Sequence, residues 1–199
     1  MGAGERTRLE SEFTRPRPDC PHPERWHATD DQSTEVEVTA LVSAMVTALQ
    51  PDFVVETGTC LGNTAEAIGR ALRANGQGHL VSLEIDHQHV LQARRRCLDL
   101  PVTIHELSSL EYLPELPIDF AFFDSLARIR AQEFERYLPW MHDRTVVGFH
   151  DTGPHHPVRN FLAPLERSGL LVSPLYLPTP RGVMFARVCG GRSDPGAIP

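Results

Sequence analysis

The sequence lacks the patterns of three broad classes of protein. No apolar run approaches the ~20 residues that a helix needs to cross a bilayer. The four cysteines are scattered and include no Cys-x-x-Cys pair, so the common metal-binding and redox motifs are missing. Basic residues are in deficit, with 19 Lys+Arg against 26 Asp+Glu and a net charge of −7, which disfavours binding to a phosphate backbone.

These absences lead us to expect a soluble protein that has neither nucleic acid nor a membrane as its partner. The scattered cysteines, together with the lack of a signal-peptide pattern, favour a reducing, cytoplasmic setting. One dense basic cluster, Arg94–Arg96, falls in a helical pattern, and we expect it to form a solvated helix face.

The length and composition fit one globular domain. At 199 residues, with 41% hydrophobic and 23% charged residues, the chain can bury one core but is short for two domains. Residues 1–34 are expected to form an N-terminal arm, in which Trp26 and His27 could close over a site as a lid. Residues 35–189 are expected to form the folded domain, and residues 190–199 a flexible tail.

Helical and strand-like patterns alternate along the domain. The expected helices cover residues 35–49, 64–74, 87–98, 129–141 and 157–168. The expected strands cover residues 53–55, 79–84, 102–105, 119–123, 145–149, 170–177 and 182–188. This order predicts an α/β fold with a doubly wound, mostly parallel seven-stranded sheet and helices on both faces, Rossmann-like in type. A Pro-rich turn joins the last two strands, so they are expected to form an antiparallel C-terminal hairpin.

In such folds, ligands bind at the carboxyl ends of the strands. The first strand runs into a loop that contains Glu56, Gly58 and Gly62 and then into a helix. Glycines let the backbone turn tightly and approach a ligand, but this spacing is not the G-x-G-x-x-G pattern of a dinucleotide site. A carboxylate at Glu56 would repel a pyrophosphate, whereas it favours a ligand with an ammonium group.

A second acidic residue, Glu84, ends the second strand and is placed to accept hydrogen bonds from ribose hydroxyls. Together with Glu56 it indicates an adenosine that carries a cationic amino-acid tail. An alternative interpretation treats both carboxylates as solvated groups and the glycines as turn formers. A nicotinamide-dependent oxidoreductase is disfavoured, because the loop lacks the third glycine and contains Glu56.

The segment 54–64, with its Glu-x-Gly-x-x-x-Gly-x-Thr pattern, resembles motif I of the class I S-adenosylmethionine-dependent methyltransferases. Residues 83–86 resemble the ribose-binding motif of that family, and residues 118–124 and 146–151 its fourth and fifth strands. The resemblance covers about residues 35–188. It is nearest to the small-molecule O-methyltransferases that include catechol O-methyltransferase, and to the cephalosporin-hydroxylase-like proteins.

This resemblance implies an S-adenosylmethionine-dependent enzyme that methylates a small molecule, most simply at oxygen, in secondary metabolism. Glu56 would face the methionine amino group, Glu84 the ribose and Ile85 the adenine. The full set of implied cofactor-binding residues is Glu56, Gly58, Thr59, Cys60, Gly62, Thr64, Glu84, Ile85, Ser108, Ser109 and Asp124.

Asp124, His150 and Asp151 end the fourth and fifth strands, and the resemblance implies a divalent metal at the matching positions. Such a cation would lower the pKa of an acceptor hydroxyl. This sequence departs from the family pattern, with a histidine before the second aspartate and Thr152 in place of an asparagine. A mixed His/carboxylate set suits Mn²⁺, Fe²⁺ or Zn²⁺ better than Mg²⁺. The alternative is that no metal binds and the His-Asp pair contacts a neighbouring loop.

The lysine that serves as the base in this family is replaced by Ala127. We expect His150, Asp151 and His155 to be the catalytic residues, with His156 as a further substitute. Two other functions stay open: a cofactor-binding or regulatory protein that has lost catalysis, and a metal-dependent hydrolase that uses Asp124, His150 and Asp151. The expected partner is a small-molecule methyl acceptor, and a homodimer is one expected assembly.

Overall fold

The computed structural model of the chain describes residues 26–27 and 32–191. Most of the predicted arm, and residues 192–199 of the predicted tail, lie outside the described residues. Within the described part, no helix is long and apolar enough to cross a membrane.

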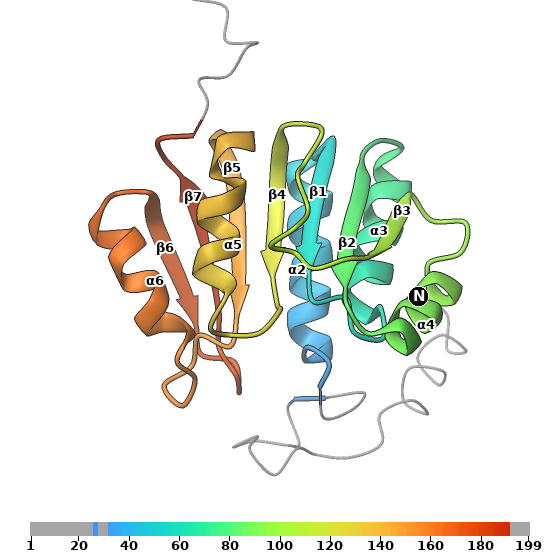
Figure 1. The fold of residues 1–199 in the computed structure, drawn as a ribbon, viewed down its shortest axis with the longest axis horizontal. Helices are drawn as coiled ribbons and strands as arrows, with labels where there is room; N and C mark the ends of the chain where they lie inside the picture. The colour runs from blue at the N-terminus through green and yellow to red at the C-terminus, as the bar shows by residue number, and fades with distance from the viewer. Residues whose placement is uncertain (1–25, 28–31, 192–199) are drawn as a thin grey trace, which may run out of the picture.

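Seven strands form one sheet in the order β3-β2-β1-β4-β5-β7-β6 (Figure 1). The strands are β1 (Phe53–Thr57), β2 (His79–Glu84), β3 (Val102–Glu106), β4 (Ile118–Phe123), β5 (Met141–His150), β6 (Leu171–Leu177) and β7 (Val183–Val188). The first five are parallel, whereas β7 runs antiparallel to both β5 and β6. The predicted fold class is therefore confirmed, including the C-terminal hairpin.

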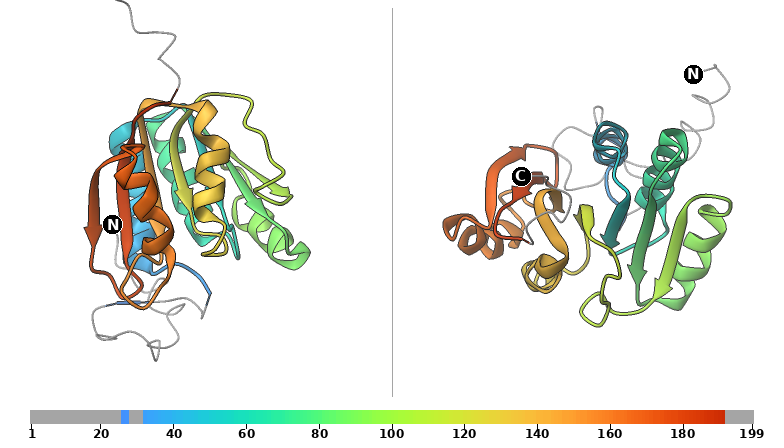
Figure 2. Two further views of the ribbon diagram at one scale, coloured as in Figure 1. Left: turned by 60° about the vertical axis from the view of Figure 1, so that its left-hand side comes forward. Right: turned by 90° about the horizontal axis from the view of Figure 1, so that it is seen from above.

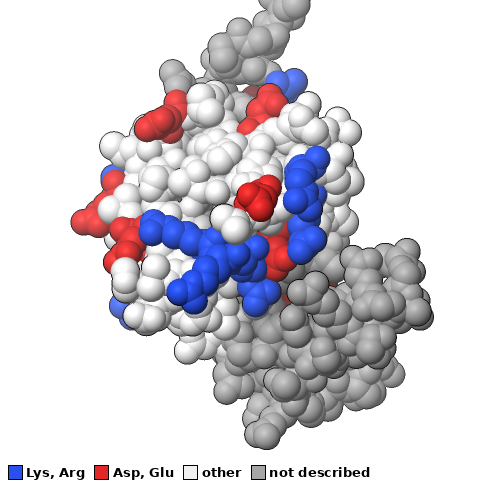
Figure 3. Space-filling view, turned by 90° about the vertical axis from the view of Figure 1, so that its right-hand side faces the viewer, with Lys and Arg blue, Asp and Glu red and all other residues white. Residues whose placement is uncertain are grey.

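Helices cover both faces of the sheet (Figure 2). They are α2 (Val36–Leu49), α3 (Asn63–Asn75), α4 (His87–Arg96), α5 (Arg130–Tyr137) and α6 (Val158–Arg167). One core cluster joins α2, α3 and α4 to the sheet, and a second joins α5 and α6 to its other face. The basic cluster Arg94–Arg96 is exposed at the end of α4, as predicted, on the face shown in Figure 3.

Strand β4 explains why the central strands read as continuous apolar runs. Phe120 and Phe122 pack on the α2 and α3 side, while Ala121 and Phe123 pack on the α5 and α6 side. Successive side chains of a strand point to opposite faces, so a strand that is covered on both sides needs apolar residues throughout.

One predicted helix is too long. The helix expected over residues 129–141 ends at Tyr137 and is followed by a 3-10 turn, η1 (Leu138–Trp140). Pro139 has no backbone N–H and therefore cannot continue the α-helical hydrogen bonds. Met141 is already the first residue of β5, which begins four residues before the predicted strand.

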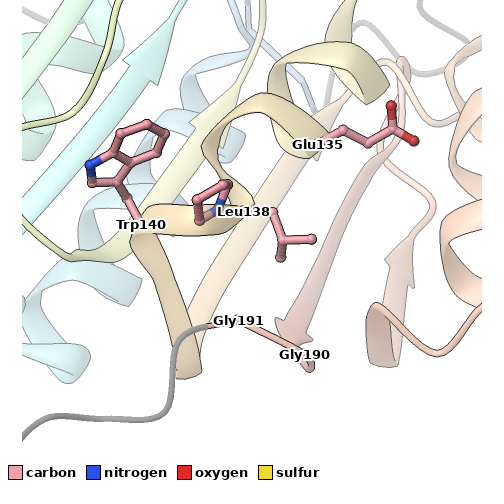
Figure 4. A pocket seen from close by; sticks show the side chains of 6 residues that line it. Glu135, Leu138, Trp140, Gly190 and Gly191 are labelled. Carbon is pink, nitrogen blue, oxygen red and sulfur yellow. The ribbon is translucent and has the colours of Figure 1, made fainter.

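The carboxyl ends of β1 to β5 meet at the lower edge of the sheet in Figure 1. The loops that follow these strands carry the predicted site residues. A separate hollow of about 630 Å³ lies at the opposite edge, against Leu138, Trp140 and Gly191 (Figure 4). None of the predicted site residues lines it.

Candidate active site

The site has two halves. The cofactor half comprises the residues at the carboxyl ends of β1, β2 and β3. The acceptor half comprises those at the ends of β4 and β5, with the turn between β6 and β7. The two halves touch at Gly58, which has a φ of 83°. A Cβ at this position would lie 2.4 Å from the carbonyl oxygen of Asp124, so no other residue fits there without displacing the end of β4.

In the cofactor half, backbone hydrogen bonds fix the loop after β1 against the end of β2. The N–H groups of Gly58 and Thr59 donate to the carbonyl of Leu83, at 3.0 and 3.2 Å. The N–H of Cys60 donates to Oε2 of Glu84 at 2.7 Å. The predicted juxtaposition of the glycine loop and Glu84 is thus present in the structure.

Glu84 is held in place by its own strand end. Its Oε1 accepts hydrogen bonds from the N–H groups of Ile85 and Asp86, at 2.8 and 2.9 Å. The side chain remains partly exposed. Beside it, Ile85 is 68% exposed, which is high for a large apolar residue and leaves a surface on which a planar ring could pack.

Glu56 is the most unusual group of this half, because its carboxyl is buried without a cation. Its Oε2 accepts a 2.5 Å hydrogen bond from the Ser82 hydroxyl, which also contacts Thr59 Oγ1 at 2.5 Å. Burial, and after it the negative charges of Asp124 and Glu84, raise the pKa of Glu56 to about 8. Within the described residues no basic side chain pairs with it.

Four other predicted cofactor residues have local partners. Gly62 caps α3 with a φ of 81°. The Thr64 hydroxyl lies 3.4 Å from that of Thr39 on α2. Ser108 Oγ accepts from the N–H of Leu110 at 3.3 Å. The Ser109 hydroxyl has a buried partner.

The Ser109 hydroxyl donates to the buried carboxyl of Glu133, which also accepts from the Thr57 hydroxyl at 3.0 Å. A buried carboxyl needs such donors, and they draw the Ser109 side chain into the domain. The hydroxyl of Ser109 is therefore engaged inside the domain, and its role in cofactor binding stays a prediction.

In the acceptor half, the predicted convergence of Asp124, His150 and Asp151 is confirmed. One ligand atom from each lies within 4.8 Å of the others. The three residues meet because β4 and β5 are adjacent and parallel, with Phe123 opposite Phe149. Asp151 adopts a left-handed conformation, with a φ of 58°, immediately after β5.

Two arginines that were not predicted as site residues occupy this cluster. Arg130, the first residue of α5, places Nη2 at 3.0 Å from Asp124 Oδ1 and 2.8 Å from Asp151 Oδ2. Arg181, in the turn between β6 and β7, binds Asp151 through two parallel contacts, Nε to Oδ1 at 2.5 Å and Nη2 to Oδ2 at 2.9 Å. Burial raises the pKa of Asp151, but His150 and these two arginines outweigh it and hold the pKa far below its usual range.

His150 lies fully buried between two carboxylates. Its Nε2 is 2.6 Å from Glu35 Oε2, and its Nδ1 is 3.0 Å from Asp124 Oδ1. Burial lowers the pKa of His150, but the nearby carboxylates outweigh it and raise the pKa to about 9. A protonated, fully buried imidazole cannot accept a proton from an acceptor, so the predicted role of His150 as a base is not supported.

The other two predicted catalytic residues differ in their surroundings. Asp151 is buried and ion-paired, so it is not a base in this arrangement. His155 is exposed in the loop after β5. The neighbouring imidazole of His156 lies nearer the cluster, with Nδ1 at 3.9 Å from Asp151 Oδ1. No lysine can replace the family base, because all 19 basic residues counted as Lys+Arg are arginines.

Glu35 was also missed as a site residue. It precedes the first residue of α2, yet its side chain does not cap that helix. Instead Oε1 accepts from the backbone N–H of Arg181 at 2.9 Å, while Oε2 contacts His150. Interactions with His150 lower its pKa against the raising effect of burial.

The last residues of the predicted arm lie over the seam between the halves. The Thr34 hydroxyl donates to Asp124 Oδ2 at 2.5 Å, and Asn63 Nδ2 donates to the Ser33 hydroxyl at 2.9 Å. Further back, His27 Nδ1 pairs with Glu37 Oε1 at 2.6 Å. Ser33 and Thr34 therefore contact residues of the strand ends and of α3, while closure of the arm over the site as a lid stays a prediction.

Comparisons with known proteins agree with this architecture. Residues 55–152, from β1 to the end of the β5 segment, match the model of a family described as a methyltransferase domain. No curated protein matches the sequence at a significant level.

Solved structures of similar fold include the O-methyltransferase TomG from Streptomyces achromogenes, involved in tomaymycin synthesis and in complex with S-adenosylmethionine. It is 20% identical, with a TM-score of 0.67 over 96% of this chain and 100% of that chain. The O-methyltransferase from Bacillus cereus, in complex with S-adenosylhomocysteine, is 20% identical, with a TM-score of 0.68 over 80% and 84%. The S-adenosylhomocysteine-bound methyltransferase PaMTH1 from Podospora anserina is 14% identical, with a TM-score of 0.69 over 95% and 97%. At these identities the likeness is one of fold.

The sheet order, the glycine loop and the acidic strand ends define a class I methyltransferase architecture. Within this architecture, residues 55–152 match the model of a methyltransferase domain.

Proposed function

We propose that this protein transfers the methyl group of S-adenosylmethionine to an oxygen atom of a small molecule. The observation that carries the proposal is the buried, uncompensated carboxyl of Glu56 beside the glycine loop. A ligand that brings a positive charge to this carboxyl restores its charge balance, and S-adenosylmethionine has both an ammonium and a sulfonium group.

In this proposal the cofactor lies along the ends of β1 and β2. Glu56 faces the ammonium group, Glu84 accepts from the ribose hydroxyls, and Ile85 packs against the adenine. The remaining contacts come from the loop and the adjacent strand ends, namely Gly58, Thr59, Cys60, Gly62, Thr64, Ser108 and Asp124.

The acceptor is proposed to lie beside the acceptor half, where two features support it. Leu126, two residues after Asp124, is 53% exposed. The hydroxyl of Thr152 is buried and makes no hydrogen bond within the described part of the chain. A buried polar group normally has a partner, so an acceptor or a water bound here would complete it. Oxygen as the methylated atom is supported by the O-methyltransferases among the proteins of similar fold.

The reaction is an in-line displacement. The acceptor oxygen attacks the methyl carbon, the carbon–sulfur bond breaks with its electron pair going to sulfur, and the acceptor hydroxyl loses a proton. The chain contributes mainly alignment of the two reactants. His156 is the best-placed imidazole to receive the proton, since Asp151 lies 3.9 Å from its ring and can orient it.

Isothermal titration calorimetry with S-adenosylmethionine and S-adenosylhomocysteine tests the cofactor assignment. We expect Glu84→Gln to weaken binding at least about tenfold, because a charged acceptor for the ribose hydroxyls is lost. Glu135→Gln is the matched control, since Glu135 is an exposed glutamate on α5 beside the separate hollow at the opposite edge and should leave affinity unchanged. Absence of any binding heat in the wild type would contradict the proposal.

Catalysis is tested separately, by incubating the protein with S-adenosylmethionine and phenolic or other hydroxylated acceptors and measuring S-adenosylhomocysteine. Binding without turnover of any acceptor would favour a cofactor-binding or regulatory protein. A cytoplasmic setting remains part of the proposal, supported by Cys97 and Cys189, which form no disulfide. The proposal includes neither nucleic acid nor a membrane as partner, and it leaves a homodimer to be tested by light scattering.

A further inference from the structure

We propose that the guanidinium groups of Arg130 and Arg181 take the place of a divalent cation between Asp124 and Asp151, so that the acceptor half works without a metal. The acceptor part of this inference rests on the proposed function. The part that concerns metal binding rests on the geometry of the cluster alone.

The predicted ligands are already engaged by cations. Both oxygens of Asp151 accept from Arg181, and Oδ2 also accepts from Arg130. Asp124 gives Oδ1 to Arg130 and Oδ2 to the Thr34 hydroxyl. A metal ion would have to displace these donors one by one, and the guanidinium groups would repel it while they stayed nearby.

His150 turns one ring nitrogen towards the cluster and the other away from it. Its two ring nitrogens face Glu35 and Asp124, at 2.6 and 3.0 Å. A metal-bound histidine needs one unprotonated nitrogen pointing at the ion, with the other nitrogen donating to a second group. Nδ1 also lies 3.6 Å from Asp151 Oδ1, so the geometry of His150 alone is compatible with a metal, and the two guanidinium groups carry the inference.

Arg130 is held in position by more than its two carboxylates. Its Nε donates to the Ser125 carbonyl at 2.8 Å, and its Nη1 donates to the carbonyl of His150. The side chain is only 3% exposed. A basic residue at the first position of a helix is unfavourable to the helix dipole, so its place at the start of α5 is explained by the carboxylates that it bridges.

Arg181 is aimed by a tightly packed turn. Gly182 has a φ of 79°, and a Cβ there would lie 2.2 Å from the backbone nitrogen of Gly153. The N–H of Gly153 donates to the Arg181 carbonyl at 2.7 Å, which ties the turn to the residues just after Asp151. The planar guanidinium then meets the carboxylate through two parallel contacts, which is the strongest arrangement for such a pair.

With two arginines in place of a metal ion, we expect a different class of acceptor. A metal centre recognises two neighbouring oxygens by chelating both, whereas an arginine cluster offers only hydrogen bonds. We therefore infer that the acceptor needs one reactive hydroxyl and no vicinal pair.

Electron paramagnetic resonance of Mn²⁺ tests the metal claim on the full chain, without reference to activity. In the wild type we expect the signal of free Mn²⁺ to persist at millimolar concentration. In Arg181→Gln, which leaves Asp151 with one cation fewer, we expect Mn²⁺ to bind at least about tenfold more tightly. Arg187→Gln is the matched control, because Arg187 is exposed on β7 outside the cluster.

Binding of S-adenosylhomocysteine, measured on the same samples, reports whether the domain and its cofactor half are intact. Tight Mn²⁺ binding by the wild type that Asp151→Asn abolishes would overturn the proposal. If Arg181→Gln binds S-adenosylhomocysteine normally but gains no affinity for Mn²⁺, Arg181 does not hold the cation position. If Arg181→Gln fails to fold, the wild-type titration alone decides. If the wild type does not bind S-adenosylhomocysteine, that result contradicts the proposed function and not the metal claim.

A chelator and two acceptors test the functional consequence. With an acceptor that has a single hydroxyl, we expect the rate of methyl transfer to be unchanged by ethylenediaminetetraacetate. A rate that falls with the chelator and returns with Mn²⁺ or Mg²⁺, or that requires a vicinal diol, would overturn the acceptor part of the proposal.

Discussion

The two halves of the site contain similar acidic groups but compensate their charge in opposite ways. In the cofactor half, Glu56 is buried with only the Ser82 hydroxyl as a partner. In the acceptor half, Asp151 has two guanidinium groups and Asp124 has one. A buried carboxyl without a cation favours a cationic ligand, whereas a carboxyl with its cation built in does not. The chain thus supplies the compensating positive charge at β4 and β5, whereas at β1 the raised pKa of Glu56 lets its carboxyl keep a proton in the ligand-free protein.

The largest expected effect comes from removing the built-in charge. Arg130→Met should lower the free energy of unfolding by about 3–5 kcal/mol, because it leaves Asp124 and Asp151 buried with less compensation. Denaturation in urea measures this change. Arg187→Met, at an exposed position on β7, should change stability by less than about 0.5 kcal/mol. A loss below about 1 kcal/mol for Arg130→Met would show that the carboxylates of the acceptor half do not depend on this arginine for charge compensation.

An intermediate effect is expected when the charge of the cofactor half is changed. Glu56 has a pKa of about 8 in the ligand-free protein, and a cationic ligand binds only when its carboxyl is ionised. Affinity for S-adenosylmethionine should therefore rise between about pH 6 and pH 8, with proton release on binding. Calorimetry in buffers of different ionisation enthalpy measures both quantities. In Glu56→Gln the affinity at pH 8 should be lower by about ten- to a hundredfold, and this pH dependence should disappear.

The raised pKa of Glu56 also predicts how the stability of the ligand-free protein depends on pH. Between about pH 4.5 and pH 8, Glu56 binds a proton more tightly in the folded than in the unfolded chain. Its contribution to stability is therefore fully present below pH 4.5 and is lost as the pH rises through 8. Glu56→Gln should make the stability of the ligand-free protein less dependent on pH over this range. An unchanged dependence would mean that Glu56 is ionised in the free protein.

The smallest effect on stability is expected at Thr152, whose hydroxyl has no partner within the described residues. Thr152→Val should change the free energy of unfolding by less than about 0.5 kcal/mol, yet lower kcat/KM for the acceptor about tenfold. Thr145→Val on β5, the strand that ends two residues before Thr152, is the matched control. Its buried hydroxyl donates to the Ile118 carbonyl at 2.6 Å, so its loss should cost about 1–3 kcal/mol. Unchanged kcat/KM in Thr152→Val would place the acceptor elsewhere.

The turn of the glycine loop could be predicted from the sequence because it is local. Glu56, Gly58 and Gly62 are neighbours in the chain, and their spacing reports the turn that they make. The mostly parallel sheet followed from the alternation of helices and strands, and the meeting of Asp124 with His150 followed once their two strands were taken to be adjacent. Ser109 could not be oriented in this way, because the buried Glu133 that accepts from it lies 24 residues away on α5.

The acceptor half was only partly predictable because its compensating groups come from distant segments. Glu35 and His150 are 115 positions apart, and Glu35 and Arg181 are 146 positions apart. Nothing in the residues next to Arg130 or Arg181 reports a carboxylate partner. The one local signal was a basic residue at the start of a helix, and it becomes visible only when the beginning of α5 is known.

The contact between Glu35 and the Arg181 backbone also sets an order of assembly during translation. A ribosome adds roughly 5–20 residues per second, so Arg181 is made roughly 7–30 s after Glu35. The strands that hold the glycine loop and Glu84 are synthesised well before that moment. The segments of the cofactor half are thus available first. Glu35 gains its contact in the acceptor half only after the turn between β6 and β7 has been synthesised.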